Sequence, residues 1–304
     1  MKYAVGMDGG GTKTEVVIAD ERGNFVHSFT SGAINYNGTD EESVRRNFQE
    51  MMDQIAHTIG GLHRCQCICI GAAGVSNPAV AERIRSVVKE CGYMGDILIT
   101  GDHETALYGA HGKPDGIILI AGTGSVCFGR NASGETHRTG GFGYLIDGEG
   151  SGYSIGRDLL SAVVRASDGR IPPTVITELV YDRLRIDSVA KIIRFVYDKH
   201  TNKKDIAALA PILTEACLKG DQEALRIAAK SAKALAELAG PVLNRLSMQD
   251  GDIAMAGSVL LKNAYIQDEF VSIMKAAYPE VRCITPKQSA AAGAVMMALE
   301  HAAE

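Results

Sequence analysis

The feature that most constrains this chain is a run of three glycines directly after an acid, close to the N-terminus. It lies in V-G-M-D-G-G-G-T-K-T, between an apolar stretch from Tyr3 and the β-branched residues that follow Glu15. This pattern predicts a strand, a tight turn and a second strand. Glycines let the backbone approach a ligand closely, and successive amides in such a turn form an anion-binding concavity. The stretch therefore predicts a phosphate-binding turn, with Asp8 at its mouth placed to hold a hydrated Mg²⁺.

Two commoner phosphate motifs do not fit this stretch. A Walker loop needs lysine directly after a glycine, but Thr12 separates Gly11 from Lys13. A dinucleotide fingerprint starting at Gly9 needs a glycine at position 14 and a helix after it, whereas the chain has Thr14 and a strand-like run. An ordinary glycine-rich hairpin turn is the remaining alternative.

Composition excludes several classes of protein. The net charge of −5 over 304 residues argues against a nucleic-acid surface, and no apolar run reaches the roughly 18 residues of a membrane span. The chain enters its first strand at once, so we expect no signal peptide and a cytoplasmic protein. The seven cysteines are dispersed, which suits a reducing compartment. Cys65, Cys67 and Cys69 alternate, and we expect them on one strand face as buried small side chains.

The remaining pattern predicts an α/β fold whose second half repeats the first. After a border at K-P-D-G, residues 113–116, a strand leads into Gly122-Thr-Gly-Ser125 and a second strand, and 140–156 is a glycine-rich loop. Strands are predicted at 3–8, 15–20, 25–30, 65–73, 97–100, 117–121, 126–131 and 253–256. Helices are predicted at 40–59, 79–91, 104–110, 187–197, 221–246 and 289–303.

Two further positions follow predicted strands, where open α/β sheets usually bind ligands. Asp102 follows the strand at 97–100, and its sequence context fits either a helix N-cap or a general base. Gly257-Ser258 follows the strand at 253–256 and is either a ligand turn or a plain strand-to-helix turn.

The motifs taken together resemble a known family over nearly the whole chain. Their order is D-G-G-G-T-K from Asp8, Asp102 after a strand, A-G-T-G-S from Ala121, G-G-F-G with E-G-S, and A-G-S before a final alanine-rich helix. This resembles the ATPase fold of actin, hexokinase and heat-shock chaperones, in the branch of N-acetylglucosamine kinase and the BadF/BcrA-type ATPases. The resemblance implies two ribonuclease-H-like domains flanking a cleft for ATP and Mg²⁺. It also implies a homodimer, and a final helix that packs back on the first domain, giving domains of 1–115 plus 287–304 and 116–286.

The resemblance also implies roles for individual residues. Asp102 matches the general base, and Asp8 would hold the metal through water. The residues matching ATP contacts are Gly9, Gly10, Gly11, Thr12, Lys13, Gly122, Thr123, Gly124, Ser125, Gly257 and Ser258. The residues matching sugar contacts are Asn35, Asp102, Thr123, Gly141, Phe142, Asp147 and Glu149.

The chain departs from the family pattern on the sugar side. Phe142 stands where the family has tryptophan, and the family's G-D-E-G-S is replaced by D-G-E-G-S, so that the acid has moved back to Asp147. The neighbouring glycines leave the backbone free to re-aim a side chain, so we expect Asp147 and Glu149 to be the sugar-side carboxylates. The competing possibility is that substrate preference has shifted.

The resemblance predicts an ATP-dependent amino-sugar kinase that converts N-acetylglucosamine to its 6-phosphate. Glucosamine or N-acetylmuramic acid are alternative substrates. A BadF/BcrA-type ATPase that activates a CoA-ester dehydratase or reductase would need cysteines for a shared iron–sulfur cluster, and here Cys127 alone follows the second loop. A sugar sensor of related fold would carry an N-terminal DNA-binding domain, whereas this chain starts in a strand.

Overall fold

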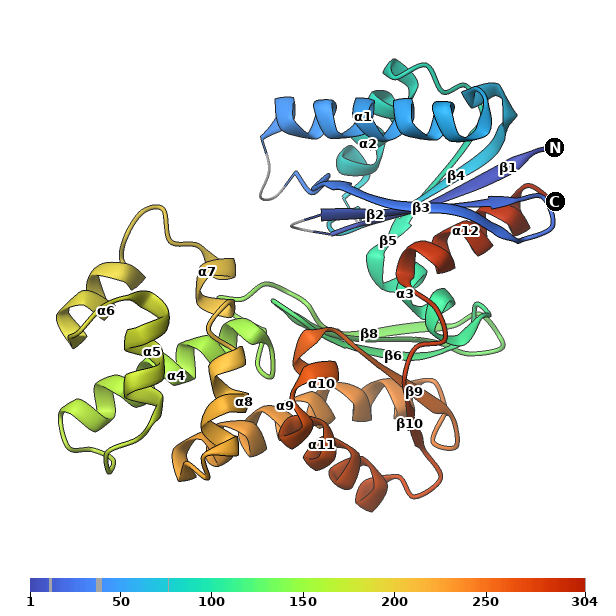
Figure 1. The fold of residues 1–304 in the computed structure, drawn as a ribbon. Helices are drawn as coiled ribbons and strands as arrows, with labels where there is room; N and C mark the ends of the chain where they lie inside the picture. Colours follow the sequence, from blue (N-terminus) through green and yellow to red (C-terminus); the bar gives the residue numbers. More distant parts are fainter. Residues whose placement is uncertain (11–12, 37–39, 76, 304) are drawn as a thin grey trace. The chain divides into compact units, whose positions relative to one another are not determined.

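A computed structural model describes residues 1–10, 13–36, 40–75 and 77–303 of the chain (Figure 1). The chain divides into two compact units, Met1–Gly116 with Pro286–Glu304, and Ile117–Thr285. The predictions for Gly11 and Thr12 concern residues outside the described ranges. Within those ranges, no helix combines the length and the apolar character needed to cross a membrane.

The first unit is built on a five-stranded sheet in the order β3-β2-β1-β4-β5. Its strands are β1 (Tyr3–Gly9), β2 (Lys13–Asp20), β3 (Phe25–Gly32), β4 (Cys65–Ala72) and β5 (Asp96–Gly101). β1 runs antiparallel to β2 and parallel to β4, which runs parallel to β5. Gly9 pairs with Ala72 and Ala72 with Gly101, so the carboxyl ends of the three parallel strands lie at one edge of the sheet.

Helices cover both faces of this sheet. They are α1 (Glu41–Ile59), α2 (Pro78–Glu90), α3 (Asp102–His111) and α12 (Ala290–His301). α1 begins where the Asp40 carboxylate accepts a hydrogen bond from the Ser43 amide, and it buries an apolar stripe that includes Phe48 and Met51 against one face. The other face carries small residues, and the alanine-rich α12 lies against it (Figure 1). The final helix thus packs on the first sheet, as the resemblance implied.

The second unit repeats the topology of the first. Its sheet has the order β10-β9-β6-β7-β8. The strands are β6 (Gly116–Ala121), β7 (Ser125–Arg130), β8 (Thr136–Gly140), β9 (Asp252–Ala256) and β10 (Arg282–Ile284). If the strands of each sheet are numbered from one to five along the chain, both sheets have the spatial order 3-2-1-4-5. The α/β class and the duplicated architecture predicted from the sequence are confirmed.

The second unit also holds most of the helices (Figure 1). They are α4 (Gly152–Ser167), α5 (Ile176–Leu184), α6 (Val189–Val196), α7 (Lys203–Ala207), α8 (Pro211–Leu218), α9 (Gln222–Arg245), α10 (Ser258–Lys262) and α11 (Ala264–Ala277). The long α9 packs against β7, β8 and α11. Its amino end is capped by the Asp221 carboxylate, which accepts a hydrogen bond from the Ala224 amide.

Three local predictions differ from the structure. β8 and β10 were not predicted, because β8 has no apolar residue and β10 is very short. The glycine-rich loop ends earlier than 156, since Ser151 caps α4 and the helix starts at Gly152. Cys65 does not share a face with Cys67 and Cys69: Cys65 packs with α1 and α2, and the other two pack with α12. A register shift in β4 between Cys65 and Cys67 inverts the alternation.

Candidate active site

Two carboxylates meet at the carboxyl edge of the first sheet. Asp8 is the penultimate residue of β1, and Asp102 directly follows β5. Asp8 pairs with Gly71 of β4, and Gly71 pairs with Thr100 of β5, so both acids lie at the same end of three parallel strands. This edge is the usual ligand position in sheets of this kind.

The environment of Asp8 raises its pKa to about 7, mainly because the carboxyl group is buried. The negative charges of Asp102 and Glu15 raise it further, and the positive charge of Lys13 partly offsets them. Glu15 lies directly opposite Asp8 in the antiparallel β1–β2 pair. This edge therefore holds an excess of negative charge that a bound cation would relieve.

The Asp102 side chain is not used as a helix cap. Gly101 occupies the N-cap position of α3, and no side chain caps that helix. The Asp102 Oδ1 accepts a hydrogen bond from the backbone amide of the next residue, His103, at 2.9 Å. The carboxylate remains 46% exposed. It is therefore accessible to a ligand at the sheet edge.

Asn35 is held close to the first glycine turn by its neighbours in the chain. A Cβ atom on Gly9 would lie 2.7 Å from the side chain of Ile34, so this segment packs directly against the end of β1. The Asn47 Nδ2 donates to the Ala33 carbonyl at 2.8 Å. Asn35 thus lies in the same unit as Asp8, close to the end of β1.

In the second unit the two predicted glycine turns are neighbours. β6 and β9 are parallel, and Ile120 pairs with Ala256 at their carboxyl ends. Gly257 has φ of +86°, and a Cβ atom there would lie 2.3 Å from the Ala121 carbonyl oxygen. Only glycine permits this approach. The turns at 122–125 and 257–258 therefore lie side by side, as a shared nucleotide site requires.

The turn at 122–125 is anchored by the start of α4. The Gly152 amide donates to the Gly122 carbonyl at 2.7 Å, and the Tyr153 amide donates to the Thr123 carbonyl at 3.3 Å. The buried Ser125 hydroxyl donates to the Glu149 carbonyl at 2.8 Å. Thr123 and Gly124 are exposed at the tip. The hydroxyl of Ser125, predicted to contact ATP, is thus engaged within the protein.

Phe142 and Asp147 are the two ends of one exposed turn. The Asp147 carboxylate accepts a hydrogen bond from the Phe142 amide at 3.0 Å. Arg138 lies over the Phe142 ring at 5.0 Å and donates to the Gly141 carbonyl at 2.7 Å. Leu145 is 79% exposed at the tip of the turn. Asp147 therefore shapes the turn that displays Phe142.

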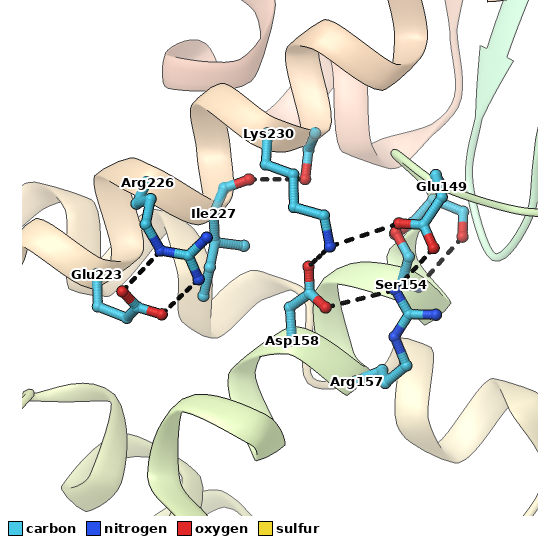
Figure 2. Close-up of polar contacts among 10 residues, drawn as sticks. Glu149, Ser154, Arg157, Asp158, Glu223, Arg226, Ile227 and Lys230 are labelled. Atoms are coloured by element: carbon cyan, nitrogen blue, oxygen red, sulfur yellow. Dashed lines mark hydrogen bonds and ion pairs between the residues drawn. The ribbon is translucent and has the colours of Figure 1, made fainter. Parts of the chain in front are cut away.

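Glu149, two residues after Asp147, lies among cationic side chains (Figure 2). Its carboxylate pairs with Arg157 of α4 at 2.7 Å and with Lys230 of α9 at 3.6 Å. These contacts lower the pKa of Glu149, against the opposing effect of its partial burial. The predicted sugar-side acids thus have different surroundings.

The residues at the edge of the first sheet fit a magnesium ion held through water. Mg²⁺ usually takes one or two protein carboxylates and keeps several waters. The described residues contain no cluster of three or more acidic, histidine or cysteine side chains able to enclose a metal, but Asp8 offers a carboxylate in a region of excess negative charge. Such an arrangement suits an ion that arrives with a nucleotide.

Several residues near these motifs were not predicted from the sequence. Glu15 could have been found, because a hairpin closed by the glycine turn pairs it with Asp8. Arg138, Arg157 and Lys230 gave no signal, since they come from elements outside the glycine motifs.

The chain is similar to several known proteins. The model of the BadF/BadG/BcrA/BcrD ATPase family matches residues 5–298. An N-acetylmuramic acid/N-acetylglucosamine kinase of Clostridium acetobutylicum is 36% identical over 301 residues, covering 98% of each chain. An N-acetyl-D-glucosamine kinase of Dictyostelium discoideum is 27% identical over 97% of each chain. The solved structure of a candidate N-acetylglucosamine kinase from Chromobacterium violaceum superposes with a TM-score of 0.80 at 23% identity, covering 98% of this chain and 99% of that one.

The fold is that of an actin-like ATPase, and ATP-dependent sugar kinases resemble the chain over nearly its whole length. The class of enzyme predicted from the sequence is confirmed. Within that class, the chain belongs to the BadF/BadG/BcrA/BcrD ATPase family.

The raised pKa of Asp8 predicts a stabilising substitution. Between about pH 4 and pH 7 the folded protein keeps a proton that the unfolded chain has lost, so the free energy of unfolding falls as pH rises through this range. Asp8→Asn removes the ionisable group and with it this pH-dependent fall in the free energy of unfolding. Without metal or nucleotide, we expect the variant to melt at a higher temperature than the wild type, by a margin that grows from pH 5.5 to pH 8.

Asp20→Asn is the matched control at the other end of the same hairpin. Hydrogen bonds with Asn24 lower the pKa of Asp20, so this variant should gain no stability relative to the wild type as pH rises. Thermal melts of the three proteins measure the effect. A pH-independent margin for Asp8→Asn would contradict the burial argument.

Proposed function

We propose that the protein is an amino-sugar kinase that transfers the γ-phosphate of ATP to the 6-hydroxyl of N-acetylglucosamine. The observation that carries this proposal is Asp102, an accessible carboxylate that caps no helix and lies on the same sheet edge as Asp8. Such a pair suits proton removal from a hydroxyl beside a metal-bound phosphate. The kinases named for N-acetylglucosamine that match nearly the full chain support the substrate class.

In the proposed reaction the protein mainly positions groups and balances charge. Asp102 accepts the proton of the attacking sugar hydroxyl as the new bond to phosphorus forms. Asp8 would hold Mg²⁺ through water, and the ion would supply positive charge to neutralise the phosphates. Gly9 and Gly10 contact the phosphates, and Asn35 orients the sugar.

The second unit contributes the remaining nucleotide contacts in this proposal. The exposed tip at Thr123 and Gly124 contacts the phosphates, and Gly257 with Ser258 contacts the nucleoside. The anchoring of the 122–125 turn by α4 supports this role, because a preorganised turn loses less conformational entropy on binding. Lys13, Gly11 and Thr12 complete the set of proposed ATP contacts.

N-acetylmuramic acid is the second candidate substrate. The turn that displays Phe142 also exposes Leu145 and Ile146, which offer apolar surface to a bulkier sugar substituent. The relative from Clostridium acetobutylicum is named for both sugars. Activation of a CoA-ester enzyme through an iron–sulfur cluster is not favoured, because Cys127 is fully buried and burial raises the pKa of its thiol.

We further propose that the enzyme works in the cytoplasm as a homodimer. Its described cysteines are all free, which suits a reducing compartment. The dimer rests on the family resemblance.

An ATP-consumption assay over a panel of sugars tests the function. The panel contains N-acetylglucosamine, glucosamine, N-acetylmuramic acid and glucose, and ³¹P NMR of the product identifies the phosphorylated hydroxyl. We expect ATP consumption to depend on sugar and to be fastest with N-acetylglucosamine. If no sugar stimulates consumption and the purified protein contains iron, the kinase proposal fails.

A separate prediction concerns Asp147, the proposed sugar-side acid. We propose that Asp147 contributes to the sugar site, both directly and by shaping the turn at Phe142. Asp147→Ala is expected to raise KM for the best sugar by about tenfold or more and to leave KM for ATP nearly unchanged, because a hydrogen-bonded sugar hydroxyl loses its partner. Steady-state kinetics with each substrate varied in turn measures the split.

Gly148→Asp restores the acid at the family position and serves as the comparison. A Cβ atom at Gly148 meets nothing closer than 3.5 Å and the backbone there is unstrained, so the variant should fold. Unchanged sugar kinetics in Asp147→Ala, together with better use of N-acetylglucosamine in Gly148→Asp, would show that position 148 is the specificity element.

A further inference from the structure

Other residues of the second unit hold Glu149 through both its backbone and its side chain. Its carbonyl accepts the hydrogen bond of the buried Ser125 hydroxyl at 2.8 Å. Its carboxylate pairs with Arg157 at 2.7 Å and with Lys230 at 3.6 Å. One residue thus connects the turn at 122–125 with α4 and α9.

The cationic partners of Glu149 are themselves fixed by a shared acid. Asp158 of α4 is only 15% exposed, and it pairs with Lys230 at 2.7 Å and with Arg157 at 3.4 Å (Figure 2). Lys230 therefore joins α9 to both acids, and Arg157 joins them on the α4 side. We call Glu149, Arg157, Asp158 and Lys230 the ion cluster.

The backbone around Glu149 has little rigidity of its own. Glycines stand at 148, 150 and 152, and Gly150 has φ of +76°. A Cβ atom on Gly150 would lie 2.7 Å from the Leu235 side chain, so the loop lies directly against α9. Because a glycine-rich segment loses much conformational entropy on ordering, an anchor is needed to keep the 149 carbonyl in place.

We propose that the ion cluster is a positioning device for the nucleotide turn. Glu149 is a positioning residue: its carboxylate holds the loop, its carbonyl holds Ser125, and Ser125 fixes the turn whose tip is Thr123 and Gly124. This inference rests on the proposed function and deepens it. It says that Glu149 affects the binding of the nucleotide. A Glu149 that contacts sugar would instead act on sugar binding.

The test compares Glu149→Gln with Glu223→Gln. Glu223 forms a two-point pair with Arg226 on α9 and, like Glu149, pairs with an arginine, but the pair lies outside the ion cluster (Figure 2). Isothermal titration with Mg·ADP measures Kd without any sugar. We expect Kd to rise about tenfold in Glu149→Gln, the effect of releasing roughly one ordered residue, and to stay unchanged in Glu223→Gln.

Two further measurements separate positioning from a general loss of folding. The double variant Glu149→Gln/Lys230→Met should bind Mg·ADP about as weakly as Glu149→Gln alone, because both changes break the same attachment. Glu149, Arg157 and Lys230 are each exposed to solvent, which weakens their ion pairs, so the melting temperature of Glu149→Gln should change only slightly.

An unchanged Kd for Mg·ADP in Glu149→Gln would overturn the inference. A raised KM for sugar with an unchanged Kd for Mg·ADP would also overturn it and would assign Glu149 to the sugar site. If the wild-type protein phosphorylates no sugar, only the proposed function fails, because the Mg·ADP comparison requires no sugar.

Discussion

Asp102→Asn is expected to lower kcat by about 10²–10⁴-fold and to leave ATP binding nearly unchanged. Asparagine keeps the size of the side chain and can still accept a hydrogen bond, but it cannot accept a proton at neutral pH. The carboxylate lies at the carboxyl edge of the first sheet and is accessible. Sugar-dependent ATP consumption gives kcat, and titration with Mg·ADP gives the nucleotide affinity.

Glu104→Gln is the control for this substitution. Glu104 lies in the same first turn of α3, so its replacement removes an equal charge from the same end of the helix. We expect kcat of this variant to stay within about threefold of the wild type, because a charge near a helix end changes energies by less than about 1 kcal/mol. Turnover at the wild-type rate in Asp102→Asn would exclude Asp102 as the general base.

Gly293→Ala should destabilise the protein, although alanine favours helices by about 1 kcal/mol over glycine. A Cβ atom at 293 would lie 2.1 Å from the Thr105 carbonyl oxygen and 2.3 Å from the Gly109 nitrogen. Both are backbone atoms of α3, so the contact can be relieved only by moving α12. We expect the free energy of unfolding of the first unit to fall by about 3 kcal/mol.

Gly240→Ala in α9 is the matched control. Its Cβ atom would approach only the Tyr278 hydroxyl, at 3.1 Å, and that side chain can shift. We expect no loss of stability in this variant, or a small gain from helix propensity. Thermal and urea unfolding of the two variants, with hydrogen exchange to localise the effect, decides between these outcomes. A stabilised Gly293→Ala would mean that α12 does not pack this closely on α3.

Much of the fold was predictable because it follows from local rules. Two apolar runs separated by flexible residues are enough to predict the pair of strands at 3–20. The same pattern predicts the pair of strands at 117–131. β8 has no apolar residue and β10 is very short, so both lack this signal and form because a neighbouring strand offers hydrogen bonds. The face of Cys65 could not be predicted either, since a single unpaired residue in β4 inverted the alternation.

The sequence by itself determined the α/β class, the glycine turn at 122–125 and the placement of Asp8 and Asp102 at the carboxyl ends of strands, because spacing and residue type control each of these locally. Only the tertiary structure decided what the acids of the D-G-E-G-S segment contact. Asp147 closes a turn on Phe142, whereas Glu149 meets Lys230, which lies far along the chain on α9. Flanking glycines leave both side chains free to point in many directions, so the packing of α4 and α9 selects the direction.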